Sequence, residues 1–143
     1  MRSYLDASVL LPLIVEEAAS GAVDDFIDRD SGGLIVGDFA AAEVASALSR
    51  LVRTRVLDAH DASARLADFD VWRAADAQAL DVERSDVRAA GLIVRRFELM
   101  LRTPDALHLA ICQRLDAPLI TLDRRLALAA RAMGVEVELL APG

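Results

Sequence analysis

The chain has 143 residues, of which 55% are hydrophobic and 27% charged, and its net charge at pH 7 is −7. These values are typical of a folded globular protein and exclude both a disordered chain and a protein that coats nucleic acid by bulk positive charge. All sixteen basic residues are arginines, which excludes enzyme classes that need a lysine, such as P-loop NTPases, Schiff-base enzymes and receiver domains. The single cysteine, Cys112, excludes an internal disulfide and a cysteine-rich zinc site.

The sequence predicts neither a membrane span nor a secretion signal. The longest apolar run near the start, residues 9–15, is too short to cross a bilayer and contains Pro12. Asp6, Glu16 and Glu17 are untypical of a signal peptide. We therefore expect a cytoplasmic protein with no membrane partner.

Short apolar segments alternate with longer segments of helical periodicity along the whole chain. In chain order, the pattern predicts a strand at 3–5, helices at 8–15 and 18–28, a strand at 34–36, helices at 39–55 and 59–78, a strand at 80–82, helices at 85–101 and 103–116, a strand at 119–122, a helix at 124–133 and a strand at 135–139. Alternation of this kind is typical of a parallel sheet covered by helices on both faces. We predict one three-layer α/β/α domain over residues 1–143, in which the order of the strands does not follow from the pattern.

Individual residues mark where several of these helices begin and end. Asp38 and Ser85 are expected to cap the helices that follow them. Thr103 and Pro104 stand where a cap residue and a first-turn proline are favoured, and Gly134 is expected to stop the helix before it.

An aspartate interrupts the apolar run at the start of the chain. Asp6 comes directly after the first predicted strand, where burying an unpaired carboxylate costs at least about 2 kcal/mol. Asp123 comes directly after the fourth strand. In open parallel sheets, ligands bind outside the carboxyl ends of the strands. If the two strands are neighbours, both carboxylates lie in one crevice.

Two further acids can reach the same edge of the sheet. Asp105 lies in the first turn of its predicted helix, and Glu43 lies near the start of the helix after the second strand. Four clustered carboxylates repel one another, so such a site requires cations. Oxygen ligands favour Mg²⁺, with Mn²⁺ as a substitute.

Each of these residues also has a simpler interpretation. Asp105 could merely interact with its helix dipole, Glu43 could be solvated, and Asp6 and Asp123 could be helix caps. His108, one turn after Asp105, is more typical of a structural histidine than of a ligand. Separately, the side chains that continue helical faces are expected to pack in the core: Leu66, Phe69, Trp72 and Cys112.

Four short motifs in order, "YLDASVLL", "AAEVASAL", "TPDALHLA" and "LITLDRRL", resemble the PIN-domain family, and specifically the VapC-type toxins of type II toxin–antitoxin pairs. The resemblance covers essentially the whole chain and carries the family's acids over as Asp6, Glu43, Asp105 and Asp123. Ser8 and Thr121 match small hydroxyl residues that accompany the first and last acids.

The resemblance implies a five-stranded parallel sheet in the order 3-2-1-4-5 and a Mg²⁺-dependent endoribonuclease. Asp6, Asp105 and Asp123 would hold one or two ions, and Glu43 would bind through water or orient the nucleophile. The implied partners are an RNA substrate, a VapB-type antitoxin and a second copy of the chain in a homodimer, with DNA bound only through the antitoxin. Arg124 and Arg125 could hold RNA phosphates, or could simply be solvated.

Two other functions share some of these sequence features. A haloacid-dehalogenase-type phosphatase needs a second aspartate two residues after the first and a lysine, but here the residue is Ser8 and lysine is absent. The stronger alternative is a PIN-like domain that binds RNA or a partner without cutting, which an intact set of acids does not favour.

Overall fold

The computed structural model describes residues 1–141 and contains a five-stranded, all-parallel sheet in the order β3-β2-β1-β4-β5. The strands are β1 (Ser3–Leu5), β2 (Leu34–Gly37), β3 (Ala77–Leu80), β4 (Leu119–Thr121) and β5 (Val137–Leu139). The α-helices are α1 (Ala7–Leu10), α2 (Ser20–Arg29), α3 (Asp38–Arg53), α4 (Ala59–Asp76), α5 (Arg84–Ile93), α6 (Thr103–Leu115) and α7 (Arg124–Ala132), and short 3-10 helices lie at η1 (Leu11–Leu13) and η2 (Phe97–Leu99). The predicted fold class and strand order are confirmed.

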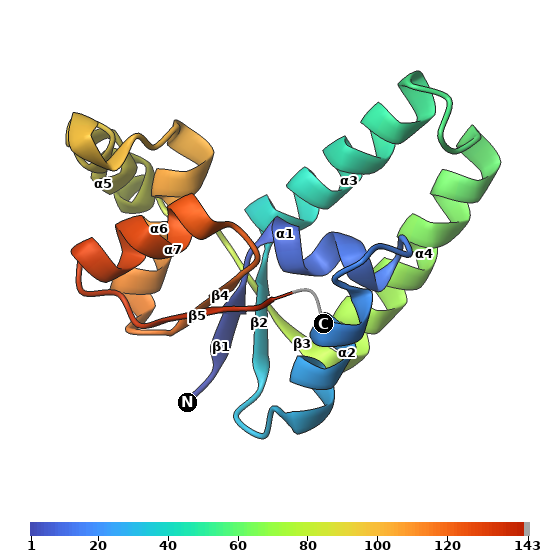
Figure 1. Cartoon of the computed structure of the whole chain (residues 1–143), viewed down its shortest axis with the longest axis horizontal. Coiled ribbons are helices and arrows are strands. Elements are labelled where there is room, and N and C mark those ends of the chain that lie inside the picture. The colour runs from blue at the N-terminus through green and yellow to red at the C-terminus, as the bar shows by residue number, and fades with distance from the viewer. Residues whose placement is uncertain (142–143) are drawn as a thin grey trace.

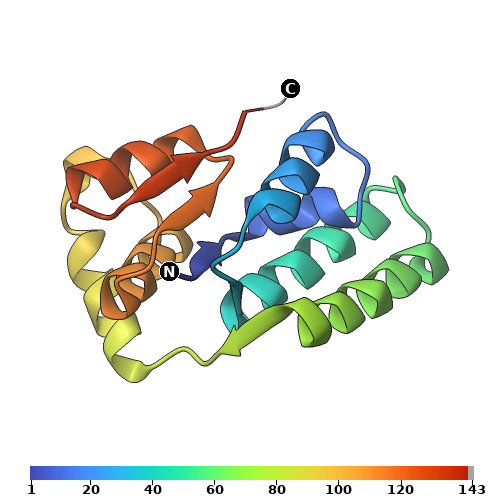
Figure 2. The ribbon, with the colours of Figure 1, turned by 90° about the horizontal axis from the view of Figure 1, so that it is seen from below.

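Helices cover both faces of the sheet (Figures 1 and 2). Helices α1 to α4 lie on one side and α5 to α7 on the other, and α3 and α4 extend beyond the sheet as a hairpin. Because successive strand residues point to opposite faces, each strand contributes to two cores. In β1, Tyr4 packs with the α5–α7 layer and Leu5 packs with the α1–α4 layer. In β4, Leu119 packs in the same core as Tyr4, and Ile120 packs in the same core as Leu5.

Pro12 explains why the first predicted helix is shorter than expected. We predicted one helix over 8–15, but the α-helix ends at Leu10 and continues as a 3-10 turn. Proline has no N–H to donate to the carbonyl four residues earlier, so the α-helical pattern cannot pass through it.

The third strand lies earlier in the chain than predicted. We placed the end of a helix at residue 78 and a strand at 80–82, but α4 ends at Asp76 and β3 spans Ala77–Leu80. The sequence "AQAL" favours a helix locally. Pairing with β2, which aligns Leu34 with Ala77 and Gly37 with Leu80, overrides that preference.

The helix predicted over 85–101 is wrong in its second half. Helix α5 ends at Ile93, and its last turn tightens, with the amides of Arg95 and Arg96 bonded to carbonyls three residues earlier. The chain then passes through η2 and leaves it at Met100, whose φ of +56° lies in the left-handed region. No glycine marks this turn, which is why the sequence did not predict it.

Three predicted helix caps are also wrong. Arg102, not Thr103, occupies the N-cap position of α6, and Thr103 is the first residue of that helix. Gly37, not Asp38, occupies the N-cap position of α3, and the Asp38 carboxylate accepts a 2.7 Å hydrogen bond from Arg73. Helix α5 begins one residue earlier than expected, with Glu83 rather than Ser85 at its N-cap. By contrast, Gly134 ends α7 with a φ of +74°, as predicted.

Over residues 1–141, no helix combines the length and the apolar character that crossing a bilayer requires.

Candidate functional site

Asp6 lies at the carboxyl end of β1 and is buried, with only 4% of its surface exposed. Its carboxylate accepts hydrogen bonds from the Ser8 hydroxyl at 2.6 Å and from the Thr121 hydroxyl at 2.8 Å. Asp6 does occupy the N-cap position of α1, but its side chain makes no capping hydrogen bond. The carboxylate is therefore held by two hydroxyls at the end of the sheet.

The same hydroxyls tie the end of β1 to the end of β4. The two strands are neighbours, with Leu5 aligned with Ile120. Ser8 accepts a 3.0 Å hydrogen bond from the amide of Leu122, and Thr121 accepts one of 3.0 Å from the amide of Asp123. The adjacency that would bring Asp6 and Asp123 to one crevice is thus present.

Asp123 is also a helix cap. Its Oδ1 accepts hydrogen bonds from the amides of Arg125 and Leu126 at 2.9 and 3.1 Å, which confirms the capping interpretation. These bonds use one carboxylate oxygen, so capping does not prevent the other from binding a ligand.

Asp105 lies in the first turn of α6, as predicted, and is half-buried. Its Oδ2 accepts a 3.4 Å hydrogen bond from the amide of Arg102 at the start of the helix. Asp105 therefore does interact with the N-terminus of its helix, as the simpler interpretation of this residue expects, through a single oxygen.

Glu43 reaches across the end of the sheet to α6. Its Oε1 lies 2.5 Å from Nε2 of His108, and Nδ1 of the same ring lies 2.6 Å from the Tyr4 hydroxyl. Both His108 and Tyr4 are buried, whereas the Glu43 side chain is 30% exposed. Glu43 is thus neither freely solvated nor fully buried.

Two of the carboxyl groups are unfavourable as anions in this setting. Burial raises the pKa of Asp6 above its ordinary value, and the hydrogen bonds from Ser8 and Thr121 offset only part of this effect. Burial also raises the pKa of Asp105, and the nearby Asp123 charge raises it further. An acidic site with raised pKa values is one whose charge a cation would stabilise.

The donor chemistry fits a hard divalent cation, because all four predicted ligands are carboxylates. Within the part of the chain that the structure describes, however, no three His, Cys, Asp or Glu side chains form a ready-made group for a metal ion. The electrostatic effects link Asp105 to Asp123, and Asp6 to His108. The four-acid metal site therefore stays a prediction.

Arg124 and Arg125 follow Asp123 and are both exposed. Among the residues described, neither forms an ion pair. The structure is compatible with both interpretations of these arginines.

The sequence did not predict that Tyr4 and His108 support Glu43. One signal was available, because a tyrosine in a buried strand requires a hydrogen-bond partner for its hydroxyl group. His108 is buried, as expected of a structural histidine. Cys112 and Phe69 pack in the two cores as predicted, and Leu66 and Trp72 are partly buried against the core that contains Phe69.

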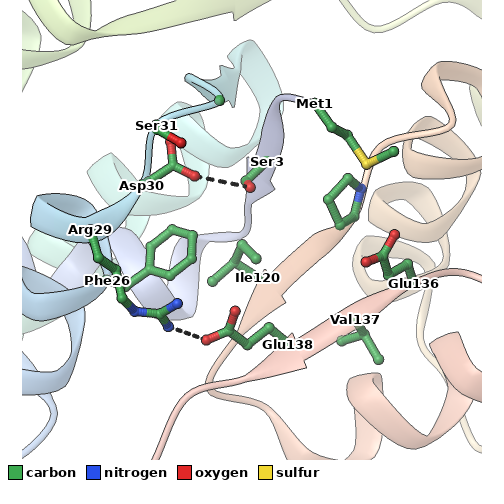
Figure 3. A pocket seen from close by; sticks show the side chains of 12 residues that line it. Met1, Ser3, Phe26, Arg29, Asp30, Ser31, Ile120, Glu136, Val137 and Glu138 are labelled. Atoms are coloured by element: carbon green, nitrogen blue, oxygen red, sulfur yellow. Dashed lines mark hydrogen bonds and ion pairs between the residues drawn. The ribbon is translucent and has the colours of Figure 1, made fainter.

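A hollow of about 530 Å³ lies elsewhere, where the strands begin (Figure 3). Asp30 accepts a hydrogen bond from Ser3 there, and Arg29 pairs with Glu138 across the opening between α2 and β5. None of the four predicted acids lines this hollow.

Comparison with known proteins identifies the family to which this fold, with its acids at the carboxyl edge of the sheet, belongs. The PIN domain model matches residues 3–132. Ribonuclease VapC46 of Mycobacterium tuberculosis is 35% identical to this chain over 137 residues, which cover 94% of each protein. The chain belongs to the PIN-domain family.

Solved structures agree on the fold. The crystal structure of Mycobacterium tuberculosis VapC20, described as a sarcin-ricin loop cleaving toxin, has a TM-score of 0.71 at 16% identity and covers 90% of this chain and 95% of its own. Rickettsia felis VapBC2, bound to a DNA fragment from its promoter, has a TM-score of 0.67 at 11% identity, with coverage of 97% and 98%.

Proposed function

We propose that this protein is a Mg²⁺-dependent endoribonuclease and the toxin of a type II toxin–antitoxin pair. One observation carries the proposal: Asp6 is buried at the carboxyl end of β1 and is held there by hydroxyls that also join it to the segment bearing Asp123. Among residues 1–141 no basic side chain forms an ion pair with this carboxylate, and a carboxylate kept in such a place suits a cation. The 35% identical relative named as a ribonuclease supports the same activity.

Asp6, Asp105 and Asp123 would hold the cation. Mg²⁺, when bound, lowers the pKa of a water molecule and neutralises charge on the phosphate and the leaving oxygen. Glu43 would bind through water or orient the attacking water in line with the phosphorus. The exposed Arg124 and Arg125 would bind RNA phosphates on either side of the cut. Breaking the bond to the 3′ oxygen leaves 5′-phosphate and 3′-hydroxyl ends.

The test is an RNA cleavage assay on purified protein freed of antitoxin. We expect cleavage with Mg²⁺ or Mn²⁺, none with EDTA, and none by Asp6→Asn at any metal concentration. Equal cleavage by wild type and Asp6→Asn would point to a contaminating nuclease and overturn the proposal. Mapping of the product ends checks that the bond to the 3′ oxygen is the one that breaks.

The same assay decides the second candidate, an RNA- or partner-binding PIN domain that does not cut. Such a protein would retain RNA in a gel-shift experiment, with or without Mg²⁺, and would yield no products.

The proposed partners are a VapB-type antitoxin and a second copy of the chain. Structural neighbours described as VapBC complexes support the antitoxin, and the one described with promoter DNA suggests that DNA binds through it. The homodimer and the cytoplasmic location stay predictions from the sequence. Expression of the toxin alone should arrest growth, and co-expression with the small protein encoded beside it should relieve the arrest. Persistent arrest would count against this pairing.

A further inference from the structure

We propose that His108, supported by Tyr4, is a positioning residue that fixes the Glu43 carboxylate for its task at the acidic site. This inference rests on the proposed function, because it assigns a second layer to the same site.

Three side chains from three different elements form a continuous hydrogen-bonded series. The Tyr4 hydroxyl in β1 lies 2.6 Å from His108 Nδ1, and His108 Nε2 in α6 lies 2.5 Å from Glu43 Oε1 in α3. Figure 1 shows α3 and α6 on opposite sides of the sheet, so the contact joins the two helical layers at the ends of the strands.

The acceptor chemistry of Glu43 fixes the direction of these bonds. An ionised carboxylate can only accept, so His108 Nε2 carries a hydrogen and donates it to Glu43. In the neutral ring, Nδ1 is then an acceptor, and the Tyr4 hydroxyl donates to it. Tyr4 thereby selects the tautomer that can hold Glu43.

The ring that holds Glu43 is itself buried and packed between other rings. His108 is 3% exposed, in a stretch of α6 where every residue from Ala106 to Cys112 is buried. The aromatic rings of Tyr4 and Phe39 pack against it, with centroids 5.6 and 5.5 Å away. A glutamate has several rotatable bonds, and the fixed histidine restricts them before any ligand arrives.

The series also begins beside the acids of the site. Tyr4 lies in β1 two residues before Asp6, which follows the strand, and His108 is one turn after Asp105 on the same helix. Leucine would fill the core without polar atoms that need partners, so packing alone does not explain a histidine here. The contact occupies Oε1 of Glu43 and leaves Oε2 for a cation or a water molecule.

The test measures Mn²⁺ binding by the disappearance of the free-ion EPR signal, in parallel with RNA cleavage. His108→Leu removes both hydrogen bonds, and we expect it to weaken Mn²⁺ binding by about 10–100-fold, the usual effect of losing a partner of a metal ligand. His108→Gln, whose amide can still donate to Glu43, should recover much of this loss. Tyr4→Phe should give a smaller loss.

Cys112→Ala is the matched control. Cys112 lies one turn further along α6 in the same core, so its truncation should lower the melting temperature without changing Mn²⁺ affinity. A second control is the pair of changes Glu43→Ala and His108→Leu. If His108 acts through Glu43, adding His108→Leu to Glu43→Ala should weaken Mn²⁺ binding no further.

Three outcomes would overturn the inference: a folded His108→Leu that both binds Mn²⁺ and cuts RNA as wild type does, a Cys112→Ala that loses as much affinity or activity, or additive losses in the double variant. Failure of the proposed function looks different, because wild type itself would then neither bind Mn²⁺ nor cut RNA, and the inference would fall with it.

Discussion

The hydroxyl of Thr121 donates a 2.8 Å hydrogen bond to Oδ2 of Asp6 across two neighbouring parallel strands. Thr121 is fully buried and also accepts the amide hydrogen of Asp123 at 3.0 Å. One hydroxyl therefore serves two of the predicted metal ligands, at the point where a parallel sheet presents its ligand site.

Replacing Thr121 by valine should destabilise the metal-free protein by about 1–3 kcal/mol, because a buried carboxylate oxygen and a backbone amide both lose a partner. Urea unfolding in EDTA measures this loss. Thr121→Ser retains the hydroxyl and should recover most of it. If valine and serine cost the same, the loss comes from packing and not from the hydrogen bonds.

Asp6→Asn should stabilise the metal-free protein at neutral pH while removing activity, a trade-off typical of active sites. Burial raises the pKa of Asp6, so the native state binds more protons than the unfolded chain between the two pKa values. The stability from this group is present below the unfolded pKa and is lost as pH rises through the folded one. We expect a gain of about 1 kcal/mol, or about 3–4 °C in Tm.

Thermal melts in EDTA and in Mg²⁺ at several pH values check this prediction. The advantage of Asp6→Asn should shrink as the pH falls below the ordinary pKa of aspartate, and Mg²⁺ should stabilise wild type alone, in proportion to occupancy. If the variant melts below wild type in EDTA and Mg²⁺ shifts neither protein, Asp6 serves the fold and not a metal.

The sequence predicted the elements whose local signals agree with their final environment. β1, β2 and β4 are short apolar runs, and both Gly134 and the start of α6 at Thr103 carry clear boundary signals. β3 was misplaced because its residues favour a helix and only pairing with β2 makes them a strand.

Asp6 could be singled out because a carboxylate in an apolar run requires an explanation. The support of Glu43 by Tyr4 and His108 could not be predicted from the sequence. Tyr4 and His108 are 104 positions apart, and His108 and Glu43 are 65 positions apart. Contacts of that kind depend on how the helical layers meet over the sheet, which a pattern of hydrophobic residues does not specify.

Breaking the ion pair between Arg114 and Asp86 should destabilise the protein by about 3–5 kcal/mol. Asp86 is 2% exposed, and Arg114 donates to both of its oxygens at 2.8 Å, which joins α6 to α5. Arg114→Leu leaves that buried carboxylate without its charged partner. Arg88→Leu, which removes an exposed arginine of α5, is the control and should change little. Urea unfolding of the three proteins provides the comparison.

The same pair predicts a pH dependence opposite to that of Asp6. Burial by itself would raise the pKa of Asp86, but the hydrogen bonds and charge of Arg114 and the amide of Glu83 bring the pKa below its ordinary value. Stability from this group is present above the unfolded pKa and is lost as pH falls through the folded one. The difference between wild type and Arg114→Leu should therefore narrow in acid. A constant difference down to the acid limit would mean that Arg114 acts by packing.

Cys112, the only cysteine of the chain, should not react with thiol reagents in the native protein at neutral pH. It is 1% exposed, and burial together with the Asp6 charge raises the pKa of its thiol, so the reactive thiolate is scarce and out of reach. Labelling with Ellman's reagent must then wait for opening of the α6 core, and its rate should rise with urea as that opening becomes more frequent. Ser46→Cys, an exposed position on α3, should label at once and shows that the reagent is active. Fast stoichiometric labelling of native wild type would contradict the prediction, because it would mean that the buried stretch from Ala106 to Cys112 opens readily.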